Sequence, residues 1–137
     1  NIFILYLFFY IFTLYIKQKY IMSVISLKGE DFTGLTLDKY DKGLVMILFK
    51  AEWCGYCNQF KKRYDELSVT LKGSVIVTKV DIDEESELLS NINGFAYGYK
   101  VMGFPTIVLY KDGKYVKTYS GDREIKDLIK FVNTVKK

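Results

Sequence analysis

The sequence predicts an α/β domain with a central mixed β-sheet, and the prediction rests on two buried strands, the helix between them and a hairpin. Continuous apolar runs at 44–49 and 75–80 are too short for ordinary helices and are typical of strands buried on both faces. Between them, apolar residues recur three and four positions apart, which indicates one face of a helix. These residues are Cys57, Phe60, Tyr64, Leu67 and Leu71. A strand, helix and strand in this order pair the strands in parallel through a right-handed crossover.

The C-terminal part adds a hairpin and a last helix. Apolar stretches at 106–110 and 115–119 flank Lys111-Asp-Gly-Lys114, which is a strong hairpin signal, so the sheet is mixed. Asp122 is predicted to cap a helix whose two C-terminal lysines suit the helix dipole. The apolar stripe of this helix consists of Ile125, Leu128, Ile129, Val132 and Val135. We expect the stripe to pack on the sheet.

Three further segments show weaker patterns. We expect a first strand at 24–27, a short helix at 32–40 and another helix at 84–92, before a glycine-rich loop at 93–98. No internal repeat or second domain is visible. Residues 22–137 are therefore predicted to form one domain.

Residues 1–21 differ in composition from the rest and are predicted to form a separate hydrophobic segment. Residues 2–16 are apolar apart from Thr13, but a helix of this length spans only about 22 Å, short of the roughly 30 Å hydrocarbon core of a bilayer. If the segment inserts, Lys17 and Lys19 favour a cytoplasm-facing anchor, because positive charges tend to stay on the cytoplasmic side. A secretory signal is disfavoured, because these charges follow the apolar run instead of preceding it.

A second interpretation is that residues 1–21 are an upstream extension absent from the native protein. The segment draws on a narrow set of amino acids, and Met22 begins a stretch of ordinary globular composition. Both interpretations stay open. Together they favour a cytoplasmic or membrane-anchored, cytoplasm-facing location over secretion.

Composition excludes several classes of function. With 50% hydrophobic residues the chain is not disordered. The net charge of +4 comes from 20 basic and 16 acidic residues that are interspersed, so no nucleic-acid footprint is visible. The absence of His removes imidazole catalysis, and two Cys supply only half of a structural zinc site. We expect neither nucleic-acid binding nor a metal centre.

The two cysteines lie where the first buried strand gives way to the helix. Cys54 falls at the predicted helix N-terminus, where unpaired backbone N–H groups and the helix dipole favour a thiolate. Cys57 begins the apolar stripe and should face the core. Two intervening residues allow the pair to close a disulfide, so Cys54 is the candidate nucleophile and Cys57 the candidate resolving thiol. The alternative is a buried, inert pair or half of a shared metal site.

Three motifs resemble the hallmarks of the thioredoxin-like superfamily, in the same order. They are Phe49-Lys-Ala-Glu-Trp-Cys-Gly-Tyr-Cys57, Lys79-Val-Asp-Ile-Asp83 and Tyr99-Lys-Val-Met-Gly-Phe-Pro-Thr106. The resemblance covers nearly all of 22–137. It implies a thioredoxin-like fold, with helices on both faces of the sheet, and redox chemistry that needs no cofactor beyond the Cys54–Cys57 disulfide.

The resemblance also assigns a substrate groove beside the cysteines. It implies a cis peptide bond before Pro105, backbone pairing of Phe104 with an incoming substrate strand, and a proline that keeps metal from bridging the thiols. The residues predicted to bind substrate are Trp53, Gly55, Tyr56, Phe104 and Pro105.

Two departures from the family concern the chemistry of the thiols. Thioredoxins and protein disulfide isomerases carry a buried carboxylate at the position of Leu48, so the acceptor for the Cys57 proton is missing. Lys79 matches a family lysine that approaches this pocket and as a cation could lower the pKa of Cys57; the alternative is a solvated lysine at a strand end. The dipeptide Gly55-Tyr56 differs from the Gly-Pro of thioredoxins and the Gly-His of eukaryotic isomerases.

These observations predict a thiol-disulfide oxidoreductase that reduces, forms or isomerises protein disulfides. Its expected partners are protein or small-molecule thiols and disulfides and a reductase or oxidant that exchanges electrons with it. We expect a monomer, with membrane contact only if residues 1–21 are native. The alternative is a binding module that holds a partner in the groove at Phe104 with little turnover.

Overall fold

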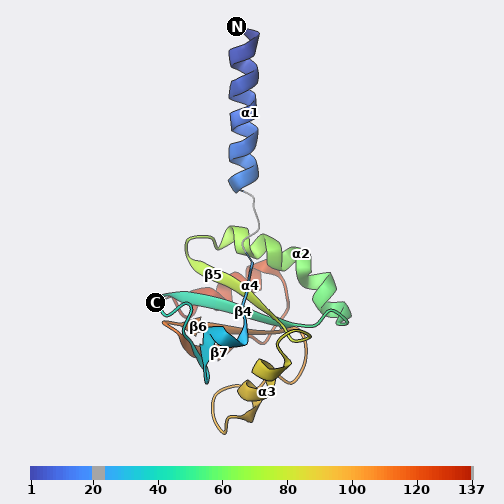
Figure 1. Cartoon of the computed structure of the whole chain (residues 1–137), viewed down its shortest axis with the longest axis vertical. Helices are drawn as coiled ribbons and strands as arrows, with labels where there is room; N and C mark the ends of the chain where they lie inside the picture. Colours follow the sequence, from blue (N-terminus) through green and yellow to red (C-terminus); the bar gives the residue numbers. More distant parts are fainter. Residues whose placement is uncertain (20–23, 137) are drawn as a thin grey trace.

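The computed structural model describes residues 1–19 and 24–136, and its centre is a five-stranded mixed sheet with the order β1-β5-β4-β6-β7 (Figure 1). The pairs β1–β5 and β4–β5 are parallel, whereas β6 runs antiparallel to both β4 and β7. The strands are β1 (Ile25–Ser26), β4 (Leu44–Lys50), β5 (Val75–Asp81), β6 (Thr106–Lys111) and β7 (Lys114–Thr118). The predicted α/β class, with a mixed sheet, is confirmed.

Helices cover both faces of the sheet. In Figure 1, α2 (Gly55–Thr70) and α4 (Ile125–Asn133) lie on one side of the sheet, and α3 (Ser86–Gly94) lies on the other. Successive side chains of β4 alternate between these layers: Met46 packs with α2 and α4, and Ile47 packs with α3. All seven residues of β4 are buried, which explains its uninterrupted apolar run.

The β6–β7 hairpin turns at Asp112 and Gly113, whose φ angles of 51° and 80° are both left-handed. Such a turn matches the twist of the flanking strands. A Cβ atom on Gly113 would lie 2.9 Å from the backbone oxygen of Leu37, and the Leu37 N–H donates to the Gly113 oxygen at 2.9 Å. Gly113 therefore meets two needs, a left-handed turn and a close backbone approach.

The predicted helix at 32–40 is wrong. The chain instead forms a short 3-10 helix, η1 (Gly29–Asp31), and a two-stranded ribbon of β2 (Phe32–Thr33) and β3 (Thr36–Leu37). The ribbon turns at Gly34, where φ is 60°. Pairing with β2 and a backbone hydrogen bond to the β6–β7 turn bury Leu37 completely, and this tertiary contact outweighs the weak helical spacing.

The predicted start of the last helix is also corrected. Its N-cap residue is Glu124, without a side-chain capping bond, and Asp122 lies before the helix. The backbone oxygen of Asp122 accepts a hydrogen bond from the Tyr119 hydroxyl, so Asp122 belongs to the turn that leads from β7.

The N-terminal helix α1 (Ile2–Lys19) lies outside the sheet domain in Figure 1. Within the described part of α1 no residue belongs to the hydrophobic core, and the large apolar side chains from Ile2 to Ile16 are 39% to 85% exposed. Of the helices that the structure describes, none has the length and apolarity needed to cross a membrane. The predicted boundary at Met22 lies outside the described residues.

Candidate active site

The cysteine pair lies at the junction of β4 and α2. Cys54 is the N-cap residue of α2, and its Sγ accepts the backbone N–H of Cys57 at 3.1 Å. The two sulfurs form a disulfide across a Cα–Cα distance of 5.2 Å. Gly55 opens the helix, as the motif predicts. Cys54 therefore lies where unpaired helical N–H groups favour a thiolate, and Cys57 lies one turn deeper.

Hydrogen bonds to the segment after β5 and to α2 hold the loop before Cys54. The Glu52 N–H donates to Asp83 Oδ2 at 2.8 Å, and Asn58 Nδ2 donates to the Glu52 oxygen at 3.1 Å. The Ile82 N–H donates to the Lys50 oxygen at 2.9 Å. The motifs 49–57 and 79–83 are thus joined by a backbone hydrogen bond and by the Asp83 side chain. The roles of Asp83 and Asn58 were not foreseen, because the two segments meet only in the folded sheet.

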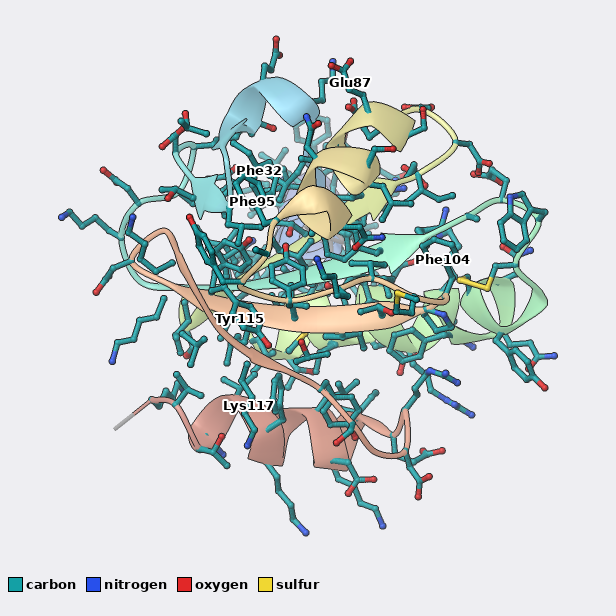
Figure 2. The ribbon with its side chains drawn as sticks, turned by 90° about the horizontal axis from the view of Figure 1, so that it is seen from below. Phe32, Glu87, Phe95, Phe104, Tyr115 and Lys117 are labelled. Carbon is teal, nitrogen blue, oxygen red and sulfur yellow. A yellow bond between two sulfur atoms is a disulfide. The ribbon has the colours of Figure 1, made fainter. Side chains whose placement is uncertain are left out.

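The third motif closes the site from the opposite side. The Phe104–Pro105 peptide bond is cis, as the resemblance implies. Phe104 packs on the cluster formed by Ala51, Cys54 and Cys57, and Figure 2 shows it beside the disulfide. The ring of Trp53 meets the Phe104 ring edge-on, with centroids 5.9 Å apart.

Large apolar side chains are exposed on the segments that carry the disulfide and Phe104. The exposed fraction is 70% for Trp53, 68% for Tyr56 and 86% for Met102. The Arg123 guanidinium lies over the Tyr56 ring, 5.9 Å from its centroid. We call the surface formed by these residues the rim; it combines apolar side chains with the cation of Arg123. Met102 and Arg123 were not predicted: Met102 stands in the third motif, two residues before Phe104, whereas nothing in the sequence marks Arg123.

The loop that carries Phe104 is anchored to α3 at Asn93, whose backbone oxygen also accepts a hydrogen bond from Lys100 Nζ at 2.6 Å. Asn93 Nδ2 donates to the Val101 oxygen at 2.9 Å, and Asn93 Oδ1 accepts the Val101 N–H at 2.8 Å. Thr106 Oγ1 also donates to the Gly103 oxygen at 2.6 Å. The Asn93 side chain thus supplies the Val101 backbone with the two hydrogen bonds that a neighbouring strand would otherwise make. The sequence analysis predicted only a glycine-rich loop at 93–98, whereas Asn93 lies within α3.

Comparison with known proteins settles the family. The family model described as Thioredoxin matches residues 23–134. The chain belongs to the thioredoxin family. Two relatives are protein disulfide isomerase-like 1-1 of Arabidopsis thaliana and protein disulfide-isomerase A3 of Gallus gallus. The plant protein is 33% identical over 113 residues, which are 80% of this chain and 21% of that protein. The chicken protein is 33% identical over 101 residues, which are 74% of this chain and 18% of that protein.

A solved structure gives the same result. The first thioredoxin domain of mouse protein disulfide-isomerase A4 superposes with a TM-score of 0.66 at 31% identity, covering 84% of this chain and 76% of that domain. The chain therefore spans about a fifth of the length of the two isomerase relatives and most of a single thioredoxin domain.

Behind the disulfide, this thioredoxin-family domain has a pocket of about 280 Å³ that reaches Cys57. Its lining residues are Val24, Leu48, Lys50, Cys57, Lys61, Tyr64, Asp65 and Lys79. Leu48 is only 2% exposed, so the family's buried carboxylate is replaced by an apolar side chain. Burial raises the pKa of the Tyr64 hydroxyl well above its usual value, so this phenol stays neutral. Neither residue supplies a base for Cys57.

Lys79 lies in the wall of this pocket. Its Nζ is 3.6 Å from Asp81 Oδ2, and 30% of its side chain is exposed. The structure thus brings Lys79 and Cys57 to one pocket, while the effect of Lys79 on the pKa of Cys57 stays a prediction.

Proposed function

We propose that this domain is a thiol-disulfide oxidoreductase whose redox centre is the Cys54–Cys57 pair. The observation that carries the proposal is the disulfide at the N-terminus of α2, next to the exposed Trp53 and the cis Phe104–Pro105 bond. A thiolate at a helix N-terminus is a good nucleophile, and an exposed apolar rim suits extended polypeptide. Partially folded proteins that contain thiols or disulfides are the substrates this arrangement fits best.

In the reducing direction, the Cys54 thiolate attacks a substrate disulfide, forms a mixed disulfide and releases one substrate thiolate. Cys57 then loses its proton to water, and its thiolate attacks Cys54 Sγ. The Cys54–Cys57 disulfide forms and the second substrate thiolate leaves, so two electrons have passed to the substrate. The reverse sequence oxidises a substrate dithiol, and the reduction potential sets the direction. Related centres range from about −270 to about −120 mV.

The test is disulfide reduction with dithiothreitol as the electron donor, compared for the parent protein, Cys54→Ser and Cys57→Ser. We expect turnover by the parent, none by Cys54→Ser, and accumulation of a mixed disulfide by Cys57→Ser. Equal, uncatalysed rates for all three proteins, with unchanged binding of a peptide, would favour the binding module instead. Equilibration with glutathione buffers then gives the potential, which separates a reductase from an oxidase or isomerase.

A further inference from the structure

The pocket behind Cys57 carries charged side chains besides Lys79, which the resemblance had already placed there. Leu48 and Lys50 are two residues apart on β4, so both side chains point to the face covered by α2. The strand register places Lys79 beside Leu48 and Asp81 beside Lys50. The ends of β4 and β5 therefore form one wall of the pocket.

Two ammonium groups in this wall share one carboxylate. Lys50 Nζ is 2.8 Å from Asp81 Oδ1, and Lys79 Nζ is 3.6 Å from Asp81 Oδ2. A second carboxylate, Glu52, lies 3.5 Å from Lys50 Nζ, but its side chain is 78% exposed and water screens it. The Lys50 and Asp81 side chains are only 11% and 15% exposed. Within this group, Lys50 and Lys79 therefore share Asp81 as their buried counter-charge.

The remaining charged groups of the pocket are Lys61 and Asp65 on α2, which form an ion pair of their own at 2.8 Å. The Lys61 side chain is 65% exposed and the Asp65 side chain 16%. Tyr64 is neutral. The cations that face Cys57 from the sheet are therefore Lys50 and Lys79, and Lys50 is the more buried of the two.

The ammonium form of Lys50 persists over the pH range of thiol chemistry. Burial alone would lower its pKa, but the hydrogen bond to Asp81 and the charges of Asp81 and Glu52 outweigh burial and raise the pKa above its usual value. The charge of Lys50 therefore does not change while the cysteines titrate.

We propose that Lys50 is a positioning residue that stabilises the Cys57 thiolate in the resolving step, in a pocket that has lost the family's carboxylate. The inference rests on the proposed function, because it concerns the attack of Cys57 on the mixed disulfide. Cys57 gives its proton to water, and the nearby cation lowers the free energy of the thiolate that remains. This domain thus favours resolution by stabilising the nucleophile instead of accepting its proton.

The proposal predicts how the rate of resolution changes with pH. Removing the charge should raise the pKa of Cys57 by about one unit, which leaves about tenfold less thiolate at pH 7. The less acidic thiolate is intrinsically more nucleophilic, so the net rate at pH 7 should fall only about threefold. Above both pKa values the variant should resolve faster than the parent. The two pH profiles therefore cross, which mere structural damage would not cause.

The experiment mixes the reduced full chain with 5,5′-dithiobis(2-nitrobenzoate) in a stopped-flow instrument between pH 6 and 10. Cys54 releases the first thionitrobenzoate, and resolution by Cys57 releases the second. We expect Lys50→Met to shift the profile of the second phase to higher pH and Lys50→Arg to restore it. Lys62→Met, which removes an exposed cation of α2 outside the pocket, is the matched control and should leave the profile in place.

Asp81→Asn provides the opposite test, because it frees both lysines from their shared counter-charge. We expect it to shift the profile to lower pH, although it breaks the same ion pair as Lys50→Met. Superimposable profiles for the parent and Lys50→Met, or shifts of Lys50→Met and Asp81→Asn in the same direction, would overturn the proposal. If the parent itself releases no second equivalent, the proposed function fails instead.

Discussion

Cys54 and Cys57 are three residues apart, yet the fold places their sulfurs in different surroundings. Cys54 is 5% exposed, and its Sγ lies at the start of α2 and accepts the Cys57 N–H, whereas Cys57 lies in the first turn of α2 and is 1% exposed. Helix N–H groups stabilise a thiolate, and apolar burial opposes one. The pair therefore has one sulfur suited to attack and one protected until a mixed disulfide forms.

We predict that, after reduction, Cys54 is alkylated at least about tenfold faster than Cys57 at pH 7 and has a pKa below the ~8.5 of a free thiol. A timed pulse of iodoacetamide followed by peptide mass spectrometry measures both rates. The single variants Cys54→Ser and Cys57→Ser are the controls, because neither can re-form the disulfide. Equal rates at the two positions would contradict the assignment of the nucleophile.

Leu48 offers a second prediction at the residue scale. Leu48→Asp places a carboxylate in the pocket that Cys57 lines, and as a base it should speed resolution at least about tenfold at pH 7. Burying this group should also lower the free energy of unfolding by about 2–4 kcal/mol. Leu48→Asn is the matched control, since it adds similar polarity without a base. A rate in Leu48→Asp no higher than in Leu48→Asn would show that the missing carboxylate does not limit resolution.

At the scale of elements, α3 acts on the site through Asn93, although none of its residues touches the disulfide cluster. The two hydrogen bonds to Val101 fix the stretch of chain that leads to Phe104. A loop held in one conformation binds substrate without a further loss of entropy. The helix opposite α2 thus helps to form the substrate groove.

Asn93→Ala should raise the KM for a peptide disulfide about three- to tenfold, because the freed loop must be ordered on binding. It should also reduce the free energy of unfolding by about 1–2 kcal/mol, since two backbone groups lose their partners. Steady-state kinetics and urea unfolding measure the two effects. Asn91→Ala, an exposed change on the same helix, is the control, and the rate of Cys54 alkylation should not change in either variant.

The β6–β7 hairpin carries a prediction about stability. Gly113 and Gly43 both have left-handed φ angles, 80° and 78°, but only a Cβ on Gly113 would meet backbone, at 2.9 Å from the Leu37 oxygen. Gly43→Ala should therefore cost about 1 kcal/mol through its φ alone, and Gly113→Ala about 3 kcal/mol. Urea unfolding measures the loss in the free energy of unfolding for both variants, and the difference between the two losses is the cost of the clash. Equal losses of stability in the two variants would mean that the β2–β3 ribbon shifts away from the added Cβ atom at no cost.

For the whole molecule, the fold divides into the sheet domain and α1. The two large core clusters and the small cluster around the disulfide are all built from residues of the sheet domain, whereas the described side chains of α1 are exposed. A large exposed apolar surface promotes association with itself or with lipid. The folding and the redox chemistry of the domain should therefore be independent of α1.

Removal of residues 1–21 should leave the Tm within about 2 °C of that of the full chain, because the described side chains of α1 take no part in the core. It should also reduce self-association. Calorimetry and light scattering after size-exclusion chromatography measure these properties, and the rate of thionitrobenzoate release serves as the activity control. A fall in Tm of more than about 5 °C would place α1 in the folded core after all.

The sequence by itself determined the α/β class, the parallel strand–helix–strand unit and the cysteine pair at a helix start. Each of these follows from the spacing of residues that are near one another in the chain: the apolar run of β4, the periodicity of α2, and Cys54 followed by Cys57. The cis bond before Pro105 came from the resemblance, because a single proline does not reveal its isomer.

Only the tertiary structure decided which distant groups meet at the site. It paired Lys50 with Asp81, hydrogen-bonded Asn93 to Val101, and replaced the expected helix at 32–40 by a ribbon. These outcomes depend on strand register and on backbone groups that need partners when they are buried. Side chains that approach one another across a sheet leave no periodic signal in the sequence, because their spacing along the chain is set by the loops and helices between them.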